Sequence, residues 1–235
     1  MIVSIHQPAY IGYLAYFARI AASDLHVVLD HVSYEKNSFI NRNRILGANG
    51  PQWLTVPIKT AGRMGQPIRE IETASDSWPV KHWRSLEQAY SKAPYWQRYR
   101  PDLMGDFAYA AMHDFPYSNS ILTSHLLKLL EIRTPRRSSC EIKACGAKSD
   151  LILNICRELA ATVYLSGPLG RDYLNLEAFE RAGIEVRFHD YRHPEYPQTR
   201  PGFVPNLSVL DLLFNCGPQS REILMRGNQD VCPGK

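Results

Sequence analysis

Short apolar runs alternate with an amphipathic segment in the amino-terminal third of the chain. Residues 2–5 and 25–29 are apolar runs of strand length, and the apolar positions over 13–21 have the spacing of a helix. A strand, a helix and a second strand in this order predict a βαβ unit, in which the two strands are parallel. Ligands bind at the carboxyl ends of the strands in such sheets, and His6 and Asp30 stand at these ends.

The middle of the chain predicts a β-rich insertion followed by a block of helices. The insertion covers residues 33–72, where a turn cluster over 47–51 precedes a strand over 53–57 that ends in a proline. Helical periodicity then predicts a block over residues 79–132, with helices over 79–99, 104–112 and 118–132.

The carboxyl-terminal third repeats an α/β rhythm. We predict helices over 151–159, 176–182 and 207–214, and strands over 140–142, 162–165 and 184–188. The whole pattern predicts an α/β protein with a mainly parallel sheet flanked by helices, interrupted by the β-rich insertion and the helical block. No linker divides the chain, so we expect a single domain over residues 1–226. The polar residues 227–235, which contain proline and glycine, are expected to form a flexible tail.

The composition is that of a globular protein and excludes few functions. The 235 residues are 45% hydrophobic and 21% charged, and no apolar run reaches the roughly 18–20 residues of a membrane helix. The chain begins without a basic, apolar leader, so we expect a cytoplasmic protein with no membrane partner. The net charge of +4 is too small to indicate nucleic-acid binding by itself. Five widely spaced cysteines do not form a disulfide framework.

Several ordered blocks of the sequence resemble the WbqC-like family. They extend over nearly the whole chain: HQPAYIGYLAYF (6–17), SDLHVVLD (23–30), YEKNSFINRNRI (34–45), WLTVP (53–57), KHWRSLEQAYSKAPY (81–95), YLSGPLGRDYL (164–174), YPQ (196–198) and PNLSVLDLLFNCG (205–217). One departure is local, because Gly12 and Tyr13 stand where the family usually has a Pro-Trp pair.

This resemblance implies a biosynthetic role. Proteins of this kind are encoded among genes for surface polysaccharides and O-antigens, and some are encoded with natural-product enzymes. The activity that this context suggests is the transfer of an acyl or aminoacyl group to the amine of an amino sugar or another small precursor.

His6 is the candidate for proton transfer because it follows the first strand. An unperturbed imidazole titrates near neutral pH and can serve as a general base. Sites of the nucleotidyltransferase type use a second histidine, where this chain has Tyr13 or Tyr16. The alternative is a histidine that only hydrogen-bonds the backbone at the end of the strand. Gln7 and Tyr10, in the same loop, are predicted to contact the substrate.

The densest polar cluster of the chain predicts a clamp for a phosphate or a carboxylate. Arginine binds such groups through two parallel N–H donors. In an extended chain the asparagines of this cluster face one way and its arginines the other, so only one pair faces a ligand. A solvated edge strand is the alternative, but asparagine is a poor strand former with no evident structural role here. The cluster consists of Lys36, Asn41, Arg42, Asn43 and Arg44.

A second anion-binding candidate follows a predicted strand in the carboxyl-terminal half. Ser166 and Gly167 begin a turn that contains glycine and precedes a helix, and backbone amides in such a turn suit an anion. Tyr173, at the end of this turn, is a further substrate-binding candidate. A plain turn without a ligand explains the same residues equally well.

Two more candidate positions lie on predicted helices. Asp211 and Asn215 are one helical turn apart, which predicts either a buried polar network or a pocket wall. In the second interpretation Asp211 is catalytic and Asn215 binds the substrate. His82, near the start of the helix over 79–99, is either a substrate ligand or an ordinary structural histidine.

No metal site is expected. His189 and His193 have ligand chemistry, but Pro194 opposes a helix that would align them. Cys140 and Cys145 lack a second pair of ligands at zinc-site spacing.

The leading hypothesis is a group-transfer enzyme that moves an acyl or aminoacyl group to the amine of a small anionic or phosphorylated substrate. The cofactor is an activated acyl donor of open identity: an aminoacyl-tRNA, a carrier-protein thioester or an acyl-adenylate. The basic residues within 133–137 suit a tRNA-borne donor. One alternative is an ATP-dependent ligase or nucleotidyltransferase that uses the same cleft. Another is a non-catalytic scaffold of a biosynthetic complex, and the sequence does not indicate the oligomeric state.

Overall fold

A parallel sheet of five strands forms the base of the fold. The structure is a computed structural model and describes residues 1–228. The strands are β1 (Ile2–His6), β2 (Leu25–Val28), β5 (Arg136–Ser138), β6 (Val163–Ser166) and β7 (Glu185–Phe188). Their order across the sheet is β5-β2-β1-β6-β7, and all neighbours are parallel. The five carboxyl ends therefore lie along one edge of the sheet.

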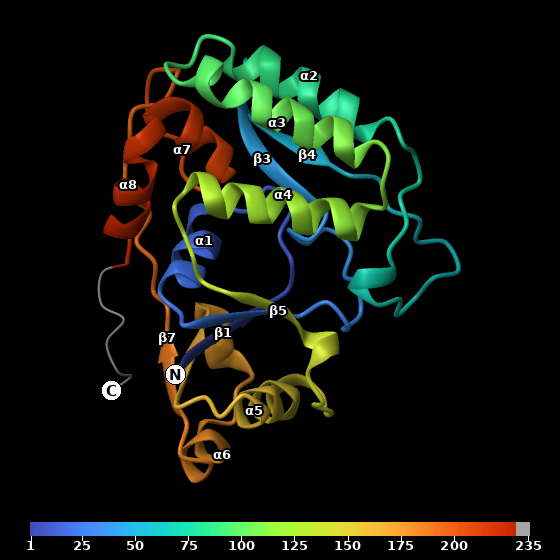
Figure 1. The fold of residues 1–235 in the computed structure, drawn as a ribbon, viewed down its shortest axis with the longest axis vertical. Coiled ribbons are helices and arrows are strands. Elements are labelled where there is room, and N and C mark those ends of the chain that lie inside the picture. Colours follow the sequence, from blue (N-terminus) through green and yellow to red (C-terminus); the bar gives the residue numbers. More distant parts are fainter. Residues whose placement is uncertain (229–235) are drawn as a thin grey trace.

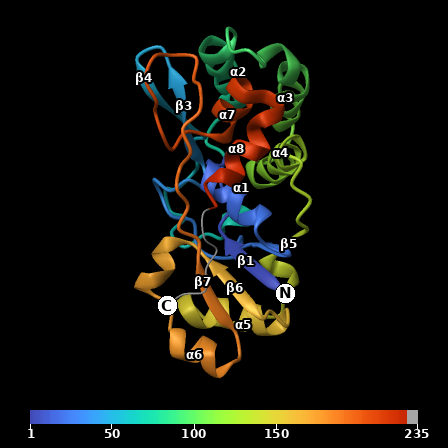
Figure 2. The ribbon, with the colours of Figure 1, turned by 90° about the vertical axis from the view of Figure 1, so that its left-hand side faces the viewer.

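Helices cover both faces of this sheet (Figure 1). They are α1 (Leu14–Ala21), α2 (Trp78–Tyr90), α3 (Trp96–Ala110), α4 (Phe115–Leu129), α5 (Lys148–Glu158), α6 (Leu176–Arg181), α7 (Val209–Cys216) and α8 (Ser220–Arg226). α5 and α6 lie on one side and α1 on the other, as the turned view in Figure 2 also shows. Within residues 1–228, none of these helices has the length and apolar character needed to cross a membrane.

The two faces of the sheet differ in polarity. Val3 and Ile5 of β1 and Val27 of β2 point toward α5 and α6, where they join an apolar core. Because side chains alternate along a strand, Ser4 and His26 point toward α1. Both are buried, and the Ser4 hydroxyl lies 2.8 Å from Nδ1 of His26. The face that meets α1 is thus polar at its centre, which is unusual for a doubly covered parallel sheet.

The β-rich insertion is a separate hairpin. β3 (Arg42–Gly47) pairs antiparallel with β4 (Gly50–Thr55) and does not join the parallel sheet. The hairpin, α2, α3, α4 and α7 enclose a second apolar core that includes Leu86, Leu103 and Leu213. In Figure 1 this half of the molecule lies at the end opposite α5 and α6.

The predicted α/β fold is confirmed, and the differences concern element boundaries. The helix expected over 79–99 is two helices, α2 and α3, because Pro94 lacks an amide N–H and restricts the residue before it. The strand expected over 140–142 is instead a 3-10 turn over Ser139–Glu141, and the strand itself is β5, just before it. Helix α8 was not predicted.

Gly227 and Asn228, the first two residues of the predicted tail, contact other parts of the fold. The carbonyl of Gly227 accepts a hydrogen bond of 3.0 Å from the backbone amide of Arg192. The side-chain oxygen Oδ1 of Asn228 lies 2.7 Å from Nε2 of His189. These two residues are therefore part of the fold, and the remainder of the predicted tail, 229–235, lies outside the described residues.

Candidate functional site

His6 lies at the carboxyl end of β1 but faces the protein interior. Its Nδ1 donates a hydrogen bond of 2.6 Å to the carbonyl of Gln7, and its Nε2 lies 3.5 Å from the Tyr13 hydroxyl. Burial, with a further contribution from the positive charge of Arg19, lowers the pKa of His6 to about 3. His6 is therefore neutral at physiological pH, with Nε2 as the nitrogen that can accept a proton.

The basic side chains of the predicted clamp contact protein groups or solvent. Lys36 is exposed. The guanidinium of Arg42 lies 4.4 Å from the centroid of the Trp53 ring, and that of Arg44 lies 5.6 Å from it. Arg44 also donates a hydrogen bond of 3.1 Å to the carbonyl of Asn206. The two arginines thus stack on one indole of the hairpin.

Asn41 and Asn43 have structural roles. Both are buried: Asn43 lies within β3 between the two arginines, and Asn41 directly precedes the strand, so the polar side chains alternate as expected for an extended chain. Asn41 donates a hydrogen bond of 2.7 Å to the carbonyl of Val56, and Asn43 donates one of 2.9 Å to the carbonyl of Ile11. The argument that these asparagines lack a structural role is therefore wrong, because Asn43 ties the hairpin to the loop after β1 and Asn41 bonds the residue that follows β4.

Ser166 and Gly167 stand at the carboxyl end of β6, next to the end of β1 in the sheet. Ser166 is buried, and its hydroxyl donates a hydrogen bond of 3.1 Å to the carbonyl of Gly167. A side chain at position 167 would collide with the guanidinium of Arg19, so the glycine makes room for this buried arginine. Tyr173, after the same turn, is exposed.

Tyr10 and His82 form a pair inside the second apolar core. The Tyr10 hydroxyl lies 2.8 Å from Nδ1 of His82, and both rings pack against Trp78. Burial lowers the pKa of His82 to about 4, an effect that a hydrogen bond to the Thr55 backbone only partly offsets. Tyr10 and His82 therefore contact each other and the apolar core, as residues with a structural role do.

We expect the free energy of unfolding to decrease as the pH falls from about 6.5 to about 4, partly because of His82. Between these values the unfolded chain binds a proton that the folded chain does not, so stability rises with pH in this window. The shift corresponds to about 3 kcal/mol at roughly 1.4 kcal/mol per pKa unit. Urea unfolding at neutral pH and near pH 4 gives the free energy of unfolding at each pH. Its decrease between the two should be smaller for His82→Gln than for the wild type. The exposed His113→Gln is the matched control, and equal losses in all three proteins would contradict this role of His82.

Asp211 and Asn215 belong to a buried network on α7. Oδ2 of Asp211 accepts hydrogen bonds from the Tyr196 hydroxyl and the Gln198 amide, each at 2.9 Å. Asn215 donates to the carbonyl of Asp211 and accepts from the Thr199 hydroxyl. Burial raises the pKa of Asp211. These contacts form a buried polar network, which is one of the two arrangements predicted for Asp211 and Asn215.

A pocket lies at the carboxyl ends of β2 and β5, at the edge of the sheet that the sequence analysis indicates. It encloses about 260 Å³ between these strand ends, the first turns of α4 and the 3-10 turn Ile68–Glu70. Pro8 and Tyr16 close it on the side of β1. None of the residues predicted for the site lines this pocket. Its charged lining residues are Arg69, Arg136, Arg137, Asp30 and Glu141.

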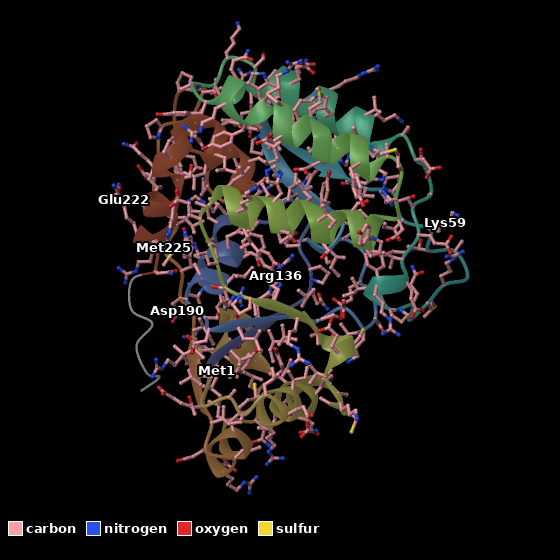
Figure 3. The ribbon with its side chains drawn as sticks, in the orientation of Figure 1. Met1, Lys59, Arg136, Asp190, Glu222 and Met225 are labelled. Atoms are coloured by element: carbon pink, nitrogen blue, oxygen red, sulfur yellow. The ribbon has the colours of Figure 1, made fainter. Side chains whose placement is uncertain are left out.

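Two polar side chains that line the pocket are the half-buried Arg136 and the buried Asn119. Figure 3 shows Arg136 between the sheet and α4, and it donates a hydrogen bond of 3.2 Å to the carbonyl of Ser120. Burial lowers the pKa of Arg136. Asn119 is 3% exposed, and its Oδ1 has no hydrogen-bond partner among residues 1–228. Because a buried amide oxygen without a partner is costly, this oxygen suits a donor that a ligand would bring.

Asp30, which lines the pocket, lies close to His31 and Cys140. One potential ligand atom from each lies within 4.8 Å of the others, a spacing compatible with a metal ion. However, Arg69 donates a hydrogen bond to Sγ of Cys140. A guanidinium at this position opposes a cation and suits an anionic sulfur, so the donor set fits a metal poorly.

β5 has no apolar residue, so hydrophobic patterning does not predict it, and the pocket at its carboxyl end is absent from the predicted site. Asp30 was noted at the end of β2, but Arg136 and Arg137 were assigned to a basic patch for a tRNA-borne donor. In the structure Arg136 faces α4, and Arg137 pairs with Glu141 at 3.6 Å. Ligands are expected at the carboxyl ends of parallel strands. This expectation places Arg136 and Arg137 at the pocket only when residues 136–138 are predicted as a strand.

Comparisons with known proteins agree with the resemblance found in the sequence. The model of the WbqC-like protein family matches residues 7–223. The uncharacterized protein Rv1507c of Mycobacterium tuberculosis is 34% identical over 223 residues, which cover 94% of this chain and 96% of that protein. No solved structure matches the chain significantly. Since both matches span nearly the whole chain, this protein belongs to the WbqC-like protein family.

Proposed function

We propose that this protein is a cytoplasmic group-transfer enzyme that attaches an acyl or aminoacyl group to the amine of a small anionic biosynthetic substrate. The observation that carries the proposal is the pocket at β2 and β5. It combines three arginines and two carboxylates with a buried amide oxygen that has no partner among residues 1–228. Pockets at this edge are the usual ligand sites of open parallel sheets.

The arginine excess of the pocket supports an anionic substrate. Glu141 is already paired with Arg137, and Arg69 is paired with Glu70 outside the lining, so Arg136 is the lining arginine without an ion pair among residues 1–228. Arg136 is held by α4 and partly desolvated, which strengthens its attraction for a phosphate or carboxylate. We therefore assign the anion to Arg136 in place of the clamp of Lys36, Arg42 and Arg44.

The acceptors of the pocket support an amine on the same substrate. Oδ1 of Asn119 and the carboxylate of Asp30 can each receive an N–H hydrogen bond, and this would orient the amine before it attacks an acyl carbon. His6 does not line the pocket, and Tyr16 lies between, with its ring centroid 5.4 Å from that of His6. Asp30 is therefore the nearer candidate for the proton-accepting role first given to His6.

The test is a series of reactions analysed by mass spectrometry. Each contains the full chain, one acyl thioester and one anionic amine, such as an amino sugar phosphate, a nucleoside-diphosphate amino sugar or an amino acid. We expect an N-acylated product of at least one amine that does not form without the protein. A product that appears only with ATP and magnesium would favour the ligase or nucleotidyltransferase. If every amine remains unchanged and a stable complex with another protein is found, the scaffold hypothesis is favoured.

A further inference from the structure

Cys140 follows β5 directly and lies among groups that can activate a thiol. Arg69 donates a hydrogen bond to its Sγ, and Oδ1 of Asp30 lies 3.4 Å from this sulfur. A ring nitrogen of His31 also lies within 4.8 Å of Sγ. The side chain is exposed, so a donor from solvent can reach the sulfur.

Two serines fix the orientation of the carboxylate and the imidazole. The Ser138 hydroxyl donates to Oδ2 of Asp30 at 2.7 Å, and the Ser139 hydroxyl donates to Oδ1 at 2.9 Å. Because Ser139 gives its only hydroxyl proton to Asp30, its oxygen accepts the 2.5 Å hydrogen bond from Nδ1 of His31. The Nε2 atom of His31 is then the nitrogen that can accept a proton. The nearby carboxylate would stabilise the resulting imidazolium.

The pocket beside Cys140 connects this cluster to a ligand site. Asp30 and Arg69 contact the thiol and also line the pocket. The same pocket is lined by Asn119, whose buried Oδ1 has no partner among the described residues. A substrate held there would lie next to the Asp30 and Arg69 side chains that contact Cys140.

We propose that Cys140 is a nucleophile that carries the acyl group as a thioester between the activated donor and the amine. This inference rests on the proposed transfer function and adds a covalent step to it. Arg69 stabilises the thiolate, and His31 is the group that accepts the thiol proton.

The proposed sequence has two balanced steps. The sulfur of Cys140 attacks the acyl carbon of an activated ester or thioester. The bond from this carbon to the leaving oxygen or sulfur then breaks, and the leaving group takes the proton from His31. The amine next attacks the Cys140 thioester, so that a C–N bond forms and the C–S bond breaks. The amine proton passes to the carboxylate of Asp30, whose Oδ1 lies 3.4 Å from Sγ, and from there to the sulfur, which restores the thiol without any oxidant or reductant.

The other cysteines of residues 1–228 provide internal comparisons. Cys145 is exposed like Cys140, but no arginine or histidine among these residues contacts its sulfur. Cys156 and Cys216 are buried, and burial raises their pKa values to about 12 and about 11. Cys145 is therefore the matched control for reactivity, and the two buried thiols are expected to be inert.

The first experiment measures the reactivity of each cysteine in the full chain. Iodoacetamide alkylation, followed by peptide mass spectrometry across a pH series, should modify Cys140 about tenfold faster than Cys145 near neutral pH. Arg69→Met should reduce the Cys140 rate toward that of Cys145 and move its pH profile upward. Equal rates and profiles for the two wild-type cysteines would overturn the proposal. Stoichiometric zinc that protects Cys140 until a chelator removes it would also overturn it, because Cys140 would then be a metal ligand.

The second experiment detects the thioester with p-nitrophenyl acetate as the acyl donor. An acetyl group should appear on the Cys140 peptide of the wild type and of Cys145→Ser, and it should be absent from Cys140→Ser and Cys140→Ala. Addition of the reactive amine from the reaction series should remove it. If Cys140→Ala forms the N-acylated product as fast as the wild type, transfer is direct and the thioester is excluded. If Cys140 is acetylated but no anionic amine accepts the group, the nucleophile is supported and the proposed function fails.

Discussion

Replacing Arg136 with glutamine is expected to raise the KM for the anionic substrate about 100-fold, with a smaller effect on kcat. A hydrogen bond to a charged partner contributes roughly 1.5–3 kcal/mol, and each 1.4 kcal/mol changes an affinity about tenfold. Arg136 is the arginine of the pocket that α4 holds in place, and burial lowers its pKa, so its charge is incompletely solvated before the ligand arrives. Steady-state kinetics with the amine identified by the reaction series gives both constants.

The matched control for this prediction is Arg133→Gln. Arg133 is an exposed arginine three residues earlier in the same segment, and it does not line the pocket. Arg136→Lys should fall between the wild type and Arg136→Gln, because an ammonium keeps the charge but loses the two-point geometry. Thermal melting checks that the variants remain folded, since Arg136 also bonds Ser120. If the glutamine variants at 133 and 136 have the same KM, the substrate does not bind in this pocket.

The strands that the sequence predicts well are those with apolar signals. β1 and β2 contain Val3, Ile5 and Val27, whose side chains enter the core beneath α5 and α6. β5 consists of two arginines and a serine, pairs with only one neighbour and ends after three residues. Its stability comes from the ladder to β2 and from the contact of Arg136 with α4. Neither interaction produces a local periodicity, so hydrophobic patterning could not reveal this strand.

The candidate residues illustrate the same difference between local geometry and tertiary partners. Alternation along β3 correctly separates Asn41 and Asn43 from Arg42 and Arg44. It cannot show that the asparagines bond carbonyls from other segments of the chain, such as that of Ile11. The rule about strand ends indicated the edge of the sheet at which this pocket lies. The pocket lies at the ends of β2 and β5. His6 is at the end of the neighbouring strand β1, and Gly167 follows β6, which is one strand further along the sheet.

Replacing Asp211 with alanine is expected to lower the free energy of unfolding by about 3 kcal/mol or more. The change leaves the buried Tyr196 hydroxyl without its acceptor and removes one of the two acceptors of the Gln198 amide. Asp211→Asn should cost much less, since its amide oxygen can accept the same two hydrogen bonds and has no charge to bury. Urea unfolding of the two variants and the wild type measures the difference.

The pH dependence separates this structural role from a catalytic one. Burial raises the pKa of Asp211, so above the ordinary pKa of about 3.9 the folded chain holds the proton more tightly than the unfolded chain. The contribution of the carboxyl group to stability is therefore greatest at low pH and decreases as the pH rises through the raised pKa. Asparagine does not titrate, so the stability of Asp211→Asn relative to the wild type should increase as the pH rises from about 4 toward neutrality. A catalytic carboxylate predicts instead that Asp211→Asn keeps its stability and loses turnover as completely as Asp211→Ala. Wild-type kcat in a stable Asp211→Asn would assign Asp211 to the structural network alone.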